Sequence, residues 1–140
     1  MAKNIIFCAD GTWNNAGDEL DDSAAPSNVF KLFTHLAGKD VSKIHHSEIT
    51  GRVTEYEKSL IIDTDVLQVS KYINGVGSSS IKLLEVLGGA FGFGLIERIA
   101  RGYTFISRNY VQGDRIYIIG FSRGAYTARA LAGLIANKGC

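Results

Sequence analysis

Three short apolar segments along the chain predict the strands of a sheet. Asn4 to Ala9 is a continuous apolar run that stops at Asp10-Gly11, as expected of a parallel strand buried on both faces. Val66 to Ile73 alternates polar and apolar positions, which predicts a second strand. The third is Ile116 to Ile119, where β-branched and aromatic residues follow the turn signal Gly113-Asp114.

Apolar residues at helical spacing predict helices between and after these strands. Ser27 or Asn28 can cap the first helix, which ends at Gly38 and whose inward face is Val29, Leu32, Phe33 and Leu36. The other helices are expected at Ile81–Leu87, Leu95–Tyr110 and Ala125–Ala136, with Gly139 placed to end the last one. Gly88 to Gly94 indicates a flexible, glycine-rich loop. Asp40 to Asp65 is the least readable stretch and predicts either a hairpin or a long insertion.

The predicted elements follow one another as strand, loop, helix, strand, helix, strand, turn and helix. Such alternation favours the α/β class, with a parallel sheet, right-handed crossovers and flanking helices. No internal repeat, low-complexity tract or linker divides the chain. Residues 1–140 are therefore expected to belong to a single domain.

Composition narrows the classes of function. A net charge of +1 and a hydrophobic fraction of 46% fit a globular protein and give no sign of nucleic-acid binding. No apolar run approaches the ~20 residues of a transmembrane segment, and the one near Met1 is too short for a signal peptide. We expect the protein to be cytoplasmic as synthesised, with secretion by a signal-less route left open. The cysteines at 8 and 140 indicate neither a disulfide framework nor a metal site.

The segment Gly120-Phe121-Ser122-Arg123-Gly124 carries the clearest chemistry. A Gly-x-Ser-x-Gly between a strand and a helix is typical of the nucleophile elbow, where a sharp turn exposes the serine for attack on an acyl carbonyl. The bare pattern is weak, because glycine is frequent in this chain. The strand before it and the alanine-rich helix after it favour Ser122 as a catalytic nucleophile. The alternative is an ordinary strand-to-helix turn with an ordinary serine.

Acyl transfer also needs two hydrogen-bond donors aimed at the oxyanion of the tetrahedral intermediate. In an elbow of this kind one donor is the backbone N–H of the residue after the nucleophile, here Arg123. The loop after the first strand offers the second donor at Gly11 or Thr12, with Asp10 beside it; the alternative is that Asp10-Gly11 is only a turn. The glycines at 75–77 and 88–94 complete neither a P-loop nor a dinucleotide motif, so no cofactor is expected.

A serine nucleophile needs a base, which is usually a histidine oriented by a carboxylate. The three histidines, His35, His45 and His46, all precede the elbow, whereas the acid and the histidine follow it in α/β-hydrolases. We expect His35 on the surface of the first helix and the other two in a loop, without a metal. The base and the acid are therefore not expected within these 140 residues.

Four segments of the chain resemble the N-terminal part of the catalytic domain of the type VI secretion phospholipase-effector family of α/β-hydrolases. They are FCADGTWN at 7–14, SNV at 27–29, YINGVG at 72–77 and residues 88–134, which include GGAFGFG and GFSRGAYTARALAGLI. The resemblance implies a partial α/β-hydrolase fold of bacterial origin, truncated after the nucleophile helix, whose acid and histidine lie beyond residue 140. It further implies a serine lipase or esterase acting on phospholipid or related acyl esters, with the Asp-Gly-Thr loop bordering the active site.

Two readings of function stay open beside each other. In the first, Ser122 is the nucleophile of an esterase whose substrate is a lipid and whose partners, if it is an effector, include immunity or secretion-apparatus proteins. In the second, the chain is an inactive truncated or split fragment that binds a partner. A nucleotide-binding α/β domain is a third and weaker reading.

Overall fold

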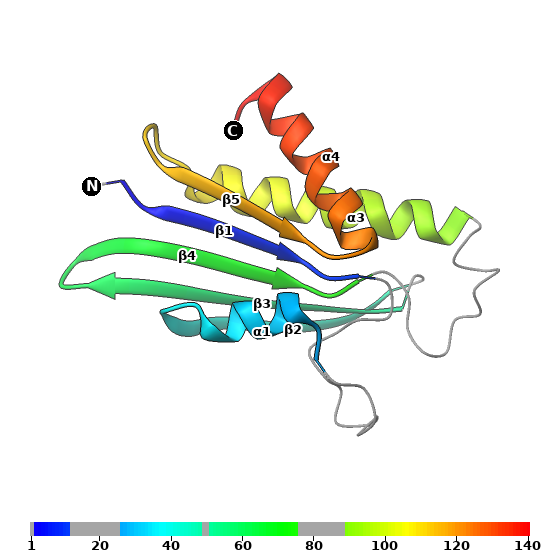
Figure 1. Ribbon diagram of the computed structural model, residues 1–140, viewed down its shortest axis with the longest axis horizontal. Coiled ribbons are helices and arrows are strands. Elements are labelled where there is room, and N and C mark those ends of the chain that lie inside the picture. Colours follow the sequence, from blue (N-terminus) through cyan, green and yellow to red (C-terminus); the bar gives the residue numbers. More distant parts are fainter. Residues whose placement is uncertain (1, 12–25, 49–50, 76–88) are drawn as a thin grey trace.

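Five strands form one sheet in the order β2-β3-β4-β1-β5 (Figure 1). The computed structural model describes residues 2–11, 26–48, 51–75 and 89–140. The strands are β1 (Asn4–Ala9), β2 (Lys39–Glu48), β3 (Gly51–Ile62), β4 (Asp65–Ile73) and β5 (Arg115–Gly120). The helices are α1 (Asn28–His35), α3 (Gly89–Asn109) and α4 (Arg123–Lys138).

Strand β1 lies in the middle of the parallel part of the sheet. It pairs in parallel with β4 on one side and with β5 on the other. At its carboxyl end Ala9 is paired with Ile73 of β4 and with Gly120 of β5. The segments that follow the three strands therefore leave the sheet at the same end, the carboxyl end of the parallel strands. Ligands bind at this end in open α/β sheets.

The alternation of side chains along β1 divides the core into two layers. Ile5, Phe7 and Ala9 pack with Ile106 of α3 and Leu131 of α4 on one face of the sheet. On the opposite face Ile6 and Cys8 pack with the inward residues of α1 and with an aromatic residue of β4, namely Val29, Phe33 and Tyr72. Both faces of β1 are thus covered, which explains why its sequence is apolar without a break.

The structure confirms the expected α/β class, with parallel strands and flanking helices, and adds two antiparallel strands, β2 and β3, beside β4. For the stretch 40–65 the sequence left a hairpin or a long insertion open, and the structure shows the hairpin. β2 pairs antiparallel with β3, and β3 pairs antiparallel with β4. A turn as short as 63–64 can only reverse the chain, because a parallel connection needs a dozen or more residues. The positions of His45 and His46, expected in a loop, lie in β2.

The expected helices at 28–38, 95–110 and 125–136 are present. Ser27 caps α1, where its Oγ accepts the backbone N–H of Phe30 at 3.1 Å. The expected loop at 88–94 is wrong for its described part, because α3 begins at Gly89. Glycine lowers helix propensity, but tertiary contacts decide, and here Arg98 of α3 donates to the carbonyl of Gly75 after β4 as well as to that of buried Gly94 one turn earlier in the helix. The helix expected at 81–87 lies outside the described residues.

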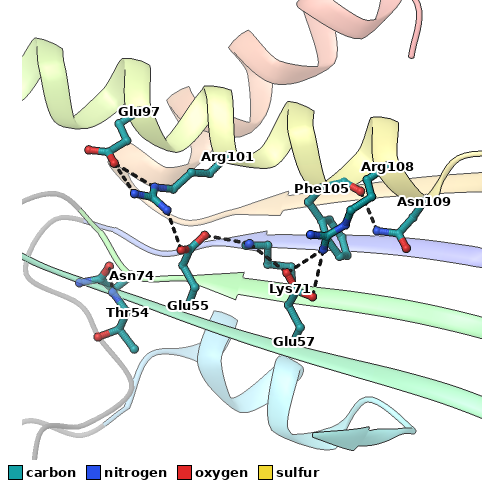
Figure 2. A network of polar contacts seen from close by, with 10 residues as sticks. All are labelled: Thr54, Glu55, Glu57, Lys71, Asn74, Glu97, Arg101, Phe105, Arg108 and Asn109. Carbon is teal, nitrogen blue, oxygen red and sulfur yellow. Dashed lines mark hydrogen bonds and ion pairs between the residues drawn. The ribbon is translucent and has the colours of Figure 1, made fainter. Parts of the chain in front are cut away.

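A network of ion pairs joins α3 to β3 and β4 (Figure 2). Lys71 Nζ lies 2.8 Å from Glu55 Oε1 and 3.1 Å from Glu57 Oε1, and all three side chains are largely buried. Arg101 reaches the second oxygen of Glu55 at 2.8 Å, and Arg108 reaches Glu57 at 3.0 Å. Each carboxylate therefore has a lysine from the sheet and an arginine from the helix, so that the charges compensate one another where α3 crosses the sheet.

Replacing Lys71 by methionine is expected to lower the free energy of unfolding by about 2 kcal/mol, the scale of a hydrogen bond to a charged group. Methionine keeps much of the lysine stem, and Glu55 and Glu57 each keep an arginine. Glu97→Ala removes a partly exposed i,i+4 pair with Arg101, an interaction whose loss is expected to cost less than about 0.5 kcal/mol. Urea unfolding of the full-length variants measures both values. Equal stability of the Lys71→Met and wild-type proteins would contradict a stabilising role of the network.

Candidate active site

Ser122 stands at the sharp turn between the end of β5 and the start of α4. Its backbone has φ 55° and ψ −123°, a conformation that L-residues adopt only when the surroundings impose it. The turn closes through hydrogen bonds from Gly124 N to Phe121 O at 2.8 Å and from Ala125 N to Ser122 O at 3.0 Å. The Ser122 and Phe121 side chains are both exposed. This is the backbone geometry of a nucleophile elbow.

The two glycines of the motif are required by close backbone approach. A Cβ on Gly120 would lie 2.2 Å from the carbonyl oxygen of Gly124. A Cβ on Gly124 would lie 2.3 Å from Ala9 O and 2.4 Å from Asp10 O. The first glycine therefore lets the turn close on itself, and the second lets the start of α4 pack directly on the end of β1.

The elbow and the loop after β1 are in direct contact. Besides the packing of Gly124, the Phe121 N–H donates to Ala9 O at 3.2 Å. Asp10 and Gly11 follow Ala9 and are buried. The structure thus brings Asp10 beside the turn that carries Ser122, while Thr12 lies outside the described residues.

Arg123 is the first residue of α4. The backbone N–H groups of the first helical turn point toward the N-terminal end of the helix, which is the end occupied by Ser122. Partial positive charge at this end favours a negative charge developing beside the serine. The backbone N–H of Arg123 therefore faces the end of α4 at which Ser122 stands.

The buried carboxylate of Asp10 connects the loop after β1 to two other elements. Its Oδ1 accepts the backbone N–H of Gly11 at 2.9 Å. Its Oδ2 accepts the hydroxyl of Ser27 at 2.6 Å and the hydroxyl of Tyr72 at 2.5 Å. Since Ser27 also caps α1, one carboxylate ties together the start of α1, the end of β4 and the loop beside the elbow.

Burial controls the protonation of the groups around this carboxylate. The pKa of the Tyr72 phenol is strongly raised, first by burial and then by the Asp10 charge and hydrogen bond, so the phenol stays a hydrogen-bond donor. The pKa of the Cys8 thiol is raised to about 12, again first by burial and then by Asp10. Cys8 is therefore a buried apolar residue of β1 rather than a nucleophile, because nucleophilic cysteines react as thiolates.

Arg98 is a buried polar residue near the carboxyl end of β4, and it was missed by the sequence analysis. Its guanidinium donates to Asn74 O at 2.8 Å, to Gly75 O at 3.0 Å and to Gly94 O at 3.1 Å. It fixes the segment after β4 to the first turns of α3. In the sequence Arg98 lies among the apolar residues Leu95, Ile96 and Ile99, and this was the signal that could have revealed it. No comparable signal pointed to Ser27 or Tyr72 as functional residues.

The structure does not place a histidine at the elbow in the part of the chain that it describes. His35 is exposed at the last turn of α1, at the opposite end of that helix from Ser27. His45 and His46 lie in β2, at the sheet edge opposite to β5. Within residues 2–11, 26–48, 51–75 and 89–140 there is also no group of three His, Cys, Asp or Glu residues arranged for a metal ion.

Comparison with known proteins identifies a family whose model matches this chain. Residues 3–140 match the family model described as T6SS, phospholipase effector Tle1-like, catalytic domain. The uncharacterized protein YEL023C of Saccharomyces cerevisiae is 31% identical over 150 residues, and the alignment covers 98% of this chain. The chain spans only 18% of the length of that relative. No solved structure matches the chain significantly.

Proposed function

The chain belongs to the catalytic-domain family of Tle1-like phospholipase effectors of type VI secretion systems, and from this premise we propose that it is the nucleophile-bearing part of a serine esterase. The observation that carries the proposal is the backbone of Ser122, held at positive φ between β5 and α4 by two glycines that admit no Cβ. A family match without this turn would leave the serine without a role.

In the proposed reaction the Ser122 hydroxyl attacks the acyl carbonyl of a phospholipid or a related ester. The Arg123 N–H and a backbone N–H of the 10–12 loop stabilise the oxyanion. Collapse of the tetrahedral intermediate releases the alcohol and leaves an acyl-enzyme, which water then hydrolyses. The general base is proposed to be a residue other than His35, His45 and His46, because their described positions are far from the elbow.

A lipid is the partner that the family supports. In the part of the chain that the structure describes, no helix has the length and apolar character needed to cross a bilayer. We propose no immunity or secretion-apparatus partner and no bacterial origin, because a similar sequence occurs in a yeast protein.

A fluorophosphonate probe tests the proposal in the full-length protein. It should label Ser122, identified by mass spectrometry of the peptide that contains it, and prior incubation with an ester substrate should slow the labelling. A full-length protein that hydrolyses esters while Ser122 stays unlabelled would refute the assignment. A full-length protein that neither hydrolyses esters nor reacts with the probe would favour the alternative of an inactive protein that binds a partner.

A further inference from the structure

Two aromatic side chains stand exposed beside the position of the nucleophile. Phe121, directly before Ser122, has 50% of its surface exposed, and Tyr126, in the first turn of α4, has 63%. In the part of the chain that the structure describes, neither residue belongs to the two apolar clusters of the core. Removing apolar surface from water is favourable, so neighbouring aromatic rings exposed next to a reactive hydroxyl are candidates for contact with a ligand.

The elbow fixes the position of Phe121 without requiring an aromatic side chain there. The Phe121 N–H donates to Ala9 O at 3.2 Å, and the Phe121 carbonyl oxygen accepts the N–H of Gly124 at 2.8 Å. Both hydrogen bonds use backbone atoms, which every residue except proline provides. Among the non-glycine residues that the structure describes, positive φ occurs at Asp63 and Ser122, so the backbone of Phe121 accepts any L-residue other than proline. The closing of the turn therefore does not explain the aromatic ring.

Helix geometry brings Tyr126 toward the same serine. Ser122 is the N-cap of α4, and residues four positions apart lie on one side of a helix. Side chains of a helix lean toward its N-terminus, which here is the end occupied by Ser122. Other residues form the buried side of α4, namely Gly124, Thr127, Ala128 and Leu131. Tyr126 therefore extends from the exposed side of α4 toward the serine.

We propose that Phe121 and Tyr126 bind the acyl chain of the ester and so determine which chain lengths Ser122 cleaves. The inference rests on the proposed function, because it assumes that the Ser122 hydroxyl attacks an acyl carbonyl. The carbonyl carbon that bonds to Ser122 Oγ carries the acyl chain directly. The first methylenes of that chain therefore lie against the residues that neighbour the serine.

The chemistry of the two side chains selects the acyl chain over the other groups on the reacting carbon. Partial positive charge at the N-terminal end of α4 favours the oxyanion. Apart from the Tyr126 hydroxyl, the two side chains offer no polar group, so they cannot replace the lost hydration of a phosphate or of a glycerol hydroxyl. Methylenes lose no hydrogen bonds to water and gain by contact with the rings. An acyl chain is therefore the occupant that this aromatic pair fits.

The experiment compares full-length variants on p-nitrophenyl acetate and p-nitrophenyl octanoate, both below the concentration at which they form micelles, with rates per site titrated by a fluorophosphonate. Each methylene moved from water into apolar contact contributes about fourfold to binding. Phe121→Ala should therefore lower kcat/KM about 20-fold for the octanoate and about twofold for the acetate, a tenfold loss of chain selectivity. Tyr126→Ala should lower this selectivity about threefold. Phe121→Leu keeps an apolar side chain and should lose less than about threefold.

Tyr117→Ala is the matched control, because it also removes an aromatic side chain of β5. Tyr117 is 45% exposed, close to the value for Phe121. It pairs with Ile6 in the middle of the strand, whereas the elbow follows the end of the strand. Its loss should leave the ratio of the two kcat/KM values within about twofold of the wild type.

The outcomes separate this inference from the proposed function. Equal fractional losses for the two esters, or an unchanged ratio in both alanine variants, would overturn the acyl-chain role. Losses confined to phospholipid vesicles, with both soluble esters unaffected, would assign the rings to a membrane surface and also overturn it. If Phe121→Ala does not fold, the ratio in Tyr126→Ala decides. A wild-type protein that the fluorophosphonate does not label at Ser122 would instead refute the proposed function.

Discussion

Ser122→Ala is expected to lower kcat for ester hydrolysis by the full-length protein on the order of 10⁴-fold or more, the scale seen when a serine nucleophile is removed. Alanine keeps the Cβ of serine, and the side chain of Ser122 is exposed, so the substitution removes the attacking oxygen and little else. Folding should therefore be preserved. Initial rates with a p-nitrophenyl ester and with phospholipid vesicles measure the effect, and the circular dichroism spectrum verifies the fold.

Ser122→Gly provides a second variant at the same position. Both substitutions remove the nucleophile, but glycine adopts φ 55° without the steric strain that any Cβ meets there. The glycine variant should therefore be more stable than the alanine variant by about 1 kcal/mol while being equally inactive. Substantial hydrolysis by either variant would show that another residue is the nucleophile. Equal stability of the two would contradict the strained backbone at the elbow.

Gly124→Ala is expected to destabilise the protein by about 3 kcal/mol or more, at the upper end of the cost of overpacking. The added methyl would lie 2.3 Å from Ala9 O and 2.4 Å from Asp10 O, and both atoms belong to backbone that cannot rotate away. Relief requires α4 to move from the end of β1, which displaces Ser122 from the loop. We therefore expect stability and activity to fall together, as measured by urea unfolding and by ester hydrolysis.

Gly133→Ala is the matched control, since both glycines lie in α4. A Cβ at Gly133 meets no atom within 4 Å, so alanine should stabilise the helix by about 0.5–1 kcal/mol through its higher helix propensity. The same substitution in one helix is thus expected to have opposite signs at the two positions. A Gly124→Ala protein with wild-type stability would contradict the close packing of the elbow on β1.

The elbow was predictable from sequence because all of its requirements lie within a few residues. An apolar strand, two glycines around a serine and an alanine-rich helix specify one local backbone. The loop after β1 was predictable for the same reason, since the strand stops at Asp10. The partners of Asp10 were not, because Ser27 and Tyr72 are distant in sequence and become neighbours only through the packing of α1 and the pairing of β4 with β1.

The hairpin could not be chosen over an insertion, and the start of α3 could not be predicted, because distant contacts compensate for their unfavourable sequences. Glu55 looks like a loop or surface residue in the sequence and Lys71 like a polar position of the predicted strand 66–73, yet both are buried because they pair with each other and with residues of neighbouring elements. The glycines at the start of α3 favour a loop by propensity alone. Arg98 binds the carbonyls of Gly94 and Gly75 and so favours the helical start that the sequence argues against.

The place of β1 between β4 and β5 has a consequence for folding kinetics. β2, β3 and β4 form a meander whose contacts are local, whereas Asn4 pairs with Gln68 and with Arg115. Contacts between distant parts of a chain form slowly, because the loop between them must close first. The meander is therefore expected to form early, and β5 to dock late against β1. The rate at which new protein becomes reactive toward a serine probe would then report the docking of β5.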